Sequence, residues 1–294
     1  MTGVTIESTS YRAWDDCLRV SNDVLELVVT VGLGPRVLAC GFVDGENLFF
    51  TDEEREPMRN GYVLHGGHRL WHAPEDEDRT YVPDEDPVEW TGTDHGVRLV
   101  QDTEEGTGIQ KTVSIALAEE EPAVEVTHEL TNEGVWTVEL APWAITVMDG
   151  GGTAVVPLSR GDPEGLLPDR SLTLWPYTDM SDDRLTFGDE AVRVDQTADG
   201  EGPLKVGASA ADEWAAYVVD GTAFVKEFVH DPAATYPDRG SGVEVYASAD
   251  SLELETLGPV EALSPGESAV HTETWRLVDG VDSVAPADVR DALE

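Results

Sequence analysis

The sequence predicts an all-β protein, a sandwich of antiparallel sheets, and three observations support this prediction. Apolar and polar residues alternate along many short segments. Turn-forming clusters of Gly, Pro, Asn and Asp separate these segments at short intervals. Segments with a helical repeat are scarce and do not alternate with strands, which disfavours a parallel α/β sheet. Neither a change in composition nor an internal repeat divides the chain, so we expect a single domain over residues 1–294.

The individual strands follow from period-two alternation. In segment 109–117, Ile109, Val113 and Ile115 share one face and polar residues occupy the other. Segment 213–230 predicts two strands joined at Asp220-Gly221, a pair that favours a tight hairpin turn. The same alternation predicts strands within segments 123–130, 242–248, 251–257 and 269–278, and a short helix is expected within 285–294.

The chain is very acidic: 60 Asp and Glu residues against 18 Lys and Arg residues give a formal charge of −42. At 1 M salt the Debye length falls to about 3 Å, so self-repulsion on this scale is tolerable in a high-salt cytoplasm. Without a basic stripe we expect neither nucleic acid nor an anionic membrane as a partner. No apolar stretch approaches about 18 residues and no basic-then-apolar leader begins the chain, so we expect a cytoplasmic protein.

Segment 64–75, LHGGHRLWHAPE, concentrates groups that can bind a ligand. His65, His68 and His72 offer the imidazoles that zinc prefers, and a metal-dependent hydrolase built on them is one interpretation. Two adjacent glycines disfavour the helix that would align these histidines, since each costs about 1 kcal/mol relative to alanine. The other interpretations are purely structural histidines, or a polar pocket where the glycines let the backbone approach a ligand. We expect the pocket and no bound metal.

Further candidates lie in the second half of the chain. Glu253 and Glu255 share one face of a strand beside a Gly-Pro turn, either as a solvated sheet face or as the rim of a pocket. Lys226 lies between two Phe residues, as a directed contact or as a surface side chain. Trp175 precedes a proline in a turn-rich segment, which is compatible with burial or with stacking on a sugar. No P-loop, GxGxxG, GxSxG or CxxC motif is present, so no cofactor is expected.

Taken together, LHGG, LWHAPE and LETLGP resemble motifs of the galactose mutarotase-like superfamily, which includes the aldose 1-epimerases. The set GGHRLWHAPE, APWAITVM, LWPYTD, YPDRG and LETLGP is more similar to an uncharacterised family of that superfamily, over roughly residues 24–277. The resemblance implies a β-supersandwich of large antiparallel sheets, whose concave sheet binds a monosaccharide. In aldose epimerases a glutamate takes the proton of the anomeric hydroxyl and a histidine protonates the ring oxygen, so the ring opens and recloses as the other anomer.

The resemblance also implies roles for residues of this chain. Glu255 matches the glutamate of the LET strand, and His65 matches the sugar-contacting histidine of LHGG. The second epimerase histidine falls where this chain has a Pro-Trp pair, so the usual acid is missing. The candidates to replace it are His68, His72 and His230, with His72 taken first and His68 second. The other expected sugar contacts are Arg69, Trp71, Trp175, Lys226, His230, Tyr236 and Asp238. We therefore expect an aldose 1-epimerase-like isomerase acting on a small-molecule sugar, neutral or acidic, with a non-catalytic sugar-binding or sensor protein as the alternative.

Overall fold

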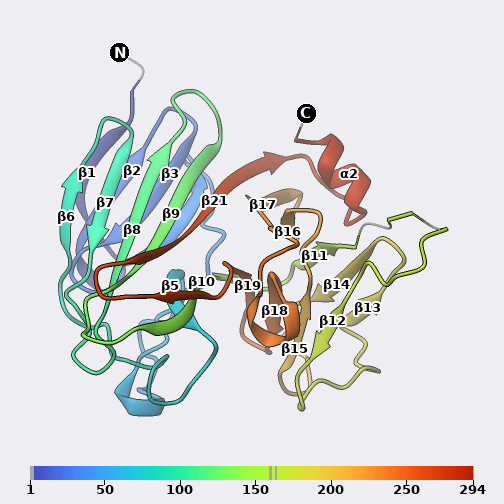
Figure 1. Cartoon of the computed structure of the whole chain (residues 1–294). Helices are drawn as coiled ribbons and strands as arrows, with labels where there is room; N and C mark the ends of the chain where they lie inside the picture. The colour runs from blue at the N-terminus through green and yellow to red at the C-terminus, as the bar shows by residue number, and fades with distance from the viewer. Residues whose placement is uncertain (1–2, 159–160, 163, 294) are drawn as a thin grey trace.

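The computed structural model describes residues 3–158, 161–162 and 164–293, and it consists of two large antiparallel sheets (Figure 1). The predicted all-β sandwich is confirmed. The eleven-stranded sheet runs in the spatial order β1 (Thr5–Tyr11), β2 (Trp14–Ser21), β3 (Leu25–Thr30), β4 (Arg36–Phe42), β5 (His68–Ala73), β10 (Val138–Met148), β19 (Leu252–Leu257), β18 (Val243–Ala247), β15 (Leu204–Ala208), β12 (Leu172–Leu174), with β20 (Glu261–Leu263) beside β10.

The ten-stranded sheet runs in the order β13 (Leu185–Phe187), β14 (Ala191–Asp195), β11 (Thr153–Pro157), β16 (Trp214–Val219), β17 (Thr222–Phe228), β21 (Ser268–Asp279), β9 (Ala123–Asn132), β8 (Ile109–Leu117), β7 (Gly96–Val100), β6 (Glu89–Gly92). In the part of the chain that the structure describes, helical structure is limited to the 3-10 turn η1 (Arg59–Gly61), the single turn α1 (Pro237–Gly240) and α2 (Pro286–Asp291). Within the described residues no helix is both long enough and apolar enough to span a membrane.

The strands that the alternation predicts form where expected. β8 spans the predicted segment 109–117, and the hairpin of β16 and β17 turns at Asp220 and Gly221. Both turn residues have positive φ, 47° and 79°, which is the backbone conformation that a two-residue hairpin turn needs. The expected C-terminal helix forms as α2.

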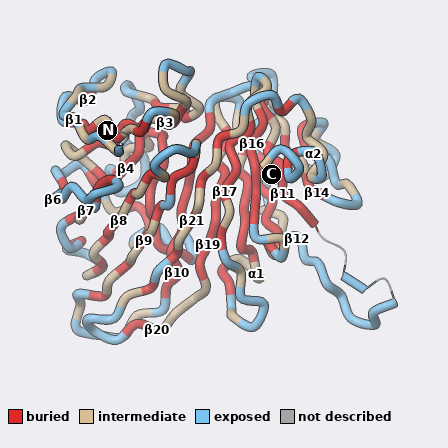
Figure 2. Tube along the Cα trace, turned by 90° about the horizontal axis from the view of Figure 1, so that it is seen from above, coloured by how far each residue is buried: buried red, intermediate tan, exposed pale blue. Residues whose placement is uncertain are grey.

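The main hydrophobic core lies between the two sheets, and buried residues follow the middle strands of both (Figure 2). Leu70 of β5 and Leu254 of β19 belong to the same apolar cluster as Phe224 of β17 and Trp275 of β21. Since side chains alternate between the faces of a strand, the neighbours of Leu70 and Leu254 point away from the second sheet. This outward face of the eleven-stranded sheet carries the candidate site.

Candidate functional site

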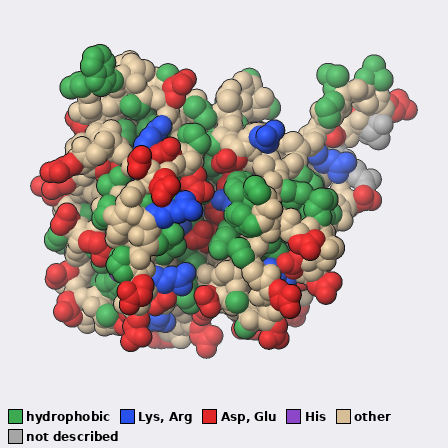
Figure 3. Space-filling model, turned by 90° about the horizontal axis from the view of Figure 1, so that it is seen from below, with side chains coloured by type: hydrophobic (Ala, Val, Ile, Leu, Met, Phe, Trp, Pro, Cys, Tyr) green, Lys and Arg blue, Asp and Glu red, His purple; other side chains and the backbone are tan. Residues whose placement is uncertain are grey.

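A cavity of about 800 Å³ opens over the outward face of β5, β10, β19, β18 and β15. Figure 3 shows a face that is hollowed near its centre, where basic, acidic and apolar side chains meet. The lining side chains are polar and aromatic, a composition suited to a hydroxylated ligand with apolar C–H faces. They include Arg55, Arg59, Arg69, Trp71, Glu75, Tyr81, Trp143, Trp175, Tyr177, Lys205, Asp238, Tyr246 and Glu253.

Packed aromatic rings build one wall of the cavity. Trp71 of β5 and Trp143 of β10 are register partners, and their ring centroids lie 5.5 Å apart at an angle of 69°. Tyr81 packs edge-on against Trp71 at 5.1 Å, and the fully buried Tyr62 packs against both. Edge-to-face contacts of this kind stabilise the rings by about 0.5–1.5 kcal/mol per pair beyond their burial. The wall is therefore rigid before any ligand binds.

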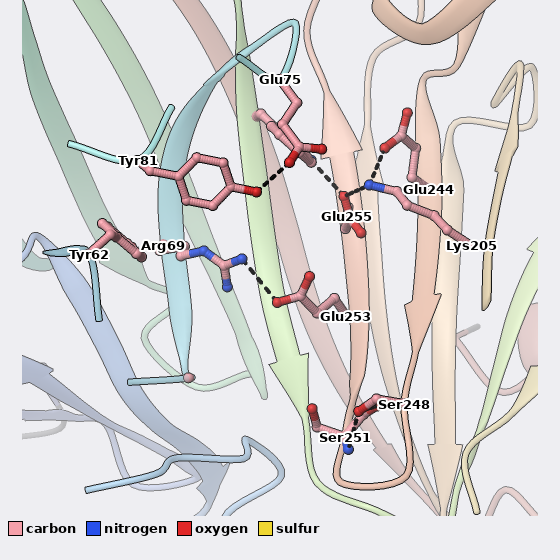
Figure 4. Close-up of polar contacts among 12 residues, drawn as sticks. Tyr62, Arg69, Glu75, Tyr81, Lys205, Glu244, Ser248, Ser251, Glu253 and Glu255 are labelled. Atoms are coloured by element: carbon pink, nitrogen blue, oxygen red, sulfur yellow. Dashed lines mark hydrogen bonds and ion pairs between the residues drawn. The ribbon is translucent and has the colours of Figure 1, made fainter. Parts of the chain in front are cut away.

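Figure 4 shows two groups of charged side chains in the cavity. Arg69 Nη2 donates to Glu253 Oε1 at 2.9 Å, and the guanidinium lies 4.2 Å from the Trp71 ring centroid. Deeper in the site, Lys205 Nζ lies 2.7 Å from Glu244 Oε2 and 2.8 Å from Glu255 Oε2. One ammonium therefore bridges two carboxyl groups on adjacent strands.

Glu255 lies one layer beneath the cavity wall. Its side chain is fully buried, and its Oε2 accepts hydrogen bonds from Trp143 Nε1 at 2.7 Å and from Lys205 Nζ. Both donors line the cavity, whereas Glu255 Oε1 has no hydrogen-bond partner among the described residues. Lys205 Nζ also lies 4.7 Å from the ring centroids of Trp143 and Trp175, so two indoles flank the ammonium.

The electrostatics of this group of three are mutually dependent. Burial raises the pKa of Glu255 and raises the pKa of Glu244 well above its usual range, and Lys205 offsets part of this effect for each. Burial alone would lower the pKa of Lys205, but the two carboxyls outweigh it and raise the pKa instead. Two carboxyls that share one ammonium in a buried site favour retention of one proton between them.

Five of the expected site residues lie at this cavity. Arg69, Trp71, Trp175 and Asp238 line it, and Glu255 lies directly beneath it. Glu253 and Glu255 share the outward face of β19, as the alternation in the sequence indicates.

The expected acids, His68 and His72, are separated from the cavity. They alternate with Arg69 and Trp71 along β5, so their side chains point between the sheets. His68 Nε2 lies 2.7 Å from His128 Nε2, and His72 Nε2 lies 3.5 Å from the buried Glu104. The strand geometry therefore removes both histidines from contact with a ligand above Glu255.

Four of the expected sugar contacts also lie elsewhere. His65 Nε2 bonds to Glu85 Oε1 at 2.9 Å, and His230 stacks on Tyr236 with ring centroids 4.5 Å apart. Lys226 is buried between the sheets, where its Nζ lies 2.9 Å from Glu273 Oε1. None of these side chains belongs to the described lining of the cavity.

The interpretation of His65, His68 and His72 as one metal site is wrong, because each has a different partner in a different place. The described residues do bring His68, His128 and Glu273 within ligand distance of one another. However, the Lys226 ammonium already neutralises Glu273, and the two imidazoles are hydrogen-bonded to each other. This interior group is a satisfied polar network.

Lys205 and Glu244 are site residues that the sequence expectations missed. The sequence does contain a signal for Lys205, because the chain has only three lysines. In the structure each of the three is buried beside a carboxylate. A lysine kept inside a protein that avoids lysine on its surface is expected to have a specific partner. Nothing in the sequence distinguishes Glu244 from the many other acids on alternating strands.

Comparison with known proteins gives the class of fold. No protein-family model matches the sequence, and no curated protein matches it as a relative. Among solved structures, a candidate aldose 1-epimerase from Escherichia coli K12 has a TM-score of 0.60 at 15% identity, over 94% of this chain and all of that one.

Two further structures agree. A candidate aldose 1-epimerase from Klebsiella pneumoniae has a TM-score of 0.62 at 12% identity, over 99% of this chain and 87% of that one. A candidate mutarotase from Salmonella typhimurium has a TM-score of 0.58 at 11% identity, over 95% of each chain. The chain has the galactose mutarotase-like fold, as its motifs indicate.

Proposed function

We propose that the protein binds a monosaccharide in the cavity above β19 and interconverts its anomers, with Glu255 as the base. The observation that supports this most is the position of Glu255. It is buried beneath a cavity of aromatic and polar side chains, with one carboxylate oxygen unpartnered in the described structure. A buried carboxylate with a raised pKa is a stronger proton acceptor than a solvated carboxylate.

The reaction requires two proton transfers, one at each of the two oxygens bonded to the anomeric carbon. The base removes the proton of the anomeric hydroxyl, the bond between the anomeric carbon and the ring oxygen breaks, and the ring oxygen takes a proton. Rotation of the aldehyde and reclosure give the other anomer. Trp71, Trp143 and Trp175 offer flat surfaces for the C–H faces of the sugar, and Arg69, Asp238 and Glu253 offer hydrogen bonds to hydroxyls.

The charges favour a neutral sugar. Arg69 is paired with Glu253, and Lys205 with two carboxyls. Arg59 lies 3.9 Å from Glu75, and Arg55 lies 3.4 Å from Asp52. A phosphate or carboxylate of a substrate would compete with these acids for every cation. A sugar hydroxyl can instead donate a hydrogen bond to the carboxylate of such a pair and accept one from its cation.

The test is anomer interconversion of neutral aldoses in concentrated KCl, followed by NMR or polarimetry. We expect saturable acceleration over buffer, and a Glu255→Gln variant that binds sugar but loses about 10²-fold or more in rate. A variant as fast as the wild type would remove Glu255 from the mechanism.

The alternative is a non-catalytic sugar-binding or sensor protein. One observation favours it: no histidine lies among the described residues that line the cavity, where an epimerase of the usual type has its acid. This alternative predicts saturable sugar binding with no rate above the buffer reaction. Calorimetric titration together with the NMR rate on the same sample separates the two functions.

A further inference from the structure

The proposed reaction needs an acid, and the cavity offers no histidine among its described lining residues. We propose that Lys205 protonates the ring oxygen in place of a histidine, and that Glu244 resupplies the proton to Lys205. This inference rests on the proposed function and identifies the acid of the same site.

Geometry is the first argument. The anomeric hydroxyl oxygen and the ring oxygen are bonded to the same carbon, so their base and acid must be close neighbours. Lys205 Nζ lies 2.8 Å from Glu255 Oε2, and Lys205 lines the cavity. A sugar whose anomeric carbon lies over this pair would present one oxygen to each group.

The second argument is the source of the proton. Glu244 and Glu255 are register partners on β18 and β19, and both carboxyls contact the same ammonium. Glu255 accepts a further hydrogen bond from the Trp143 indole N–H, which stabilises its ionised form. Among the described residues Glu244 contacts the Lys205 ammonium at 2.7 Å and has no second donor that corresponds to Trp143. The carboxylate is therefore better stabilised on Glu255, and the shared proton is favoured on Glu244.

The charged groups that face Glu244 agree with this assignment. They are Lys205 from β15, Glu255 from β19 and Asp238 from α1, the last two of which disfavour a second negative charge. Burial adds to their effect, and the pKa of Glu244 is raised well above its ordinary value. The resting site is then a neutral Glu244, a charged Lys205 and an ionised Glu255.

The proton transfers balance. Glu255 takes the proton of the anomeric hydroxyl as that oxygen forms the carbonyl bond. The electron pair of the bond to the ring oxygen moves to the ring oxygen, which takes a proton from Lys205, and Lys205 takes the proton of Glu244. The open-chain state has a neutral Glu255 and an ionised Glu244, and reclosure on the other face reverses every step.

Three variants test the inference. Lys205→Arg keeps the positive charge but cannot release a proton at ordinary pH, so we expect kcat to fall about 10²-fold or more while sugar affinity changes little. In Lys205→Ala, added methylamine should restore part of the rate. Glu244→Gln keeps the shape of the side chain but cannot donate a carboxyl proton. The wild-type rate should fall as the pH rises through the raised pKa of Glu244, and this high-pH (alkaline) limb should disappear in Glu244→Gln.

Matched controls are available in another buried lysine–glutamate pair. Lys111 Nζ lies 2.6 Å from Glu104 Oε1, both side chains are 1% exposed, and neither lines the cavity. Lys111→Arg and Glu104→Gln should change the melting temperature but leave kcat and the alkaline limb in place.

The outcomes separate this inference from the proposed function. An inactive wild-type protein, or an unaffected Glu255→Gln variant, contradicts the proposed function. If Glu255→Gln is inactive while Lys205→Arg keeps the full rate, Lys205 serves only as a positive charge and the inference is wrong. An alkaline limb unchanged in Glu244→Gln excludes Glu244 as the proton source.

Discussion

The hydrogen bond from Trp143 to Glu255 gives the sharpest quantitative prediction. Trp143→Phe keeps an aromatic ring in the wall and removes the indole N–H that lies 2.7 Å from Glu255 Oε2. A hydrogen bond to a charged group contributes about 1.5–3 kcal/mol, and 1.36 kcal/mol corresponds to one pKa unit. Because the bond stabilises the carboxylate, its loss should raise the pKa of Glu255 further, by about 1–2.

The assay is the dependence of the anomerisation rate on pH. The base must be ionised, so the acidic limb of the profile should move to higher pH by about 1–2 in Trp143→Phe, and the plateau should change less. The apparent pKa of this limb belongs to the coupled pair of Glu244 and Glu255 and not to one carboxyl alone.

Trp71→Phe is the matched control. It makes the same substitution in the register partner of Trp143, whose indole N–H has no partner among the described residues. It should loosen the aromatic wall to a similar extent without moving the acidic limb. Equal displacement of the limb in both variants, or none in Trp143→Phe, would refute the reasoning.

Three further predictions follow from burial and charge. His72→Asn should leave the rate per folded molecule unchanged, as measured by active-site-normalised NMR exchange, because His72 points between the sheets; a hundredfold loss would return it to the mechanism. Glu104 is buried, which alone would raise its pKa, but Lys111 and His72 outweigh burial and lower the pKa to about 2. A depressed folded-state pKa stabilises the protein above the unfolded value of about 4.5, and this stability is lost as pH falls from there towards 2, so Glu104→Gln should flatten the acid-side decline in a urea titration. With a formal charge of −42, the melting temperature should rise between 0.1 M and 1 M KCl, and a constant or falling value would contradict the expected salt adaptation.

Local patterns in the sequence were sufficient to predict the strands. Alternation of apolar and polar residues predicted β8, and Asp220-Gly221 predicted the hairpin of β16 and β17. Alternation also placed Glu253 and Glu255 on one face of β19. These features depend on residues close together in the chain, so a local pattern contains the information.

The orientation of the two faces of β5 cannot be predicted from local patterns. Alternation separates Arg69 and Trp71 from His68 and His72, but it does not reveal which pair faces the cavity and which faces the second sheet. That choice depends on pairing with β10, about 70 residues further along the chain.

The cluster around Lys205 depends on long-range pairing in the same way. Lys205, Glu244 and Glu255 come from three strands that become neighbours only in the assembled sheet. Lys205 lies in the eleven-stranded sheet and Lys226 in the ten-stranded sheet, a difference that no local pattern in the sequence indicates.

A crystal structure with a neutral monosaccharide bound tests the central claim most directly. We predict the sugar over β19, stacked on an indole, with its anomeric carbon above Lys205 and Glu255 and both of its oxygens within about 3 Å of those groups. A sugar bound outside this cavity, or bound with its anomeric carbon turned away from Lys205 and Glu255, would contradict the account.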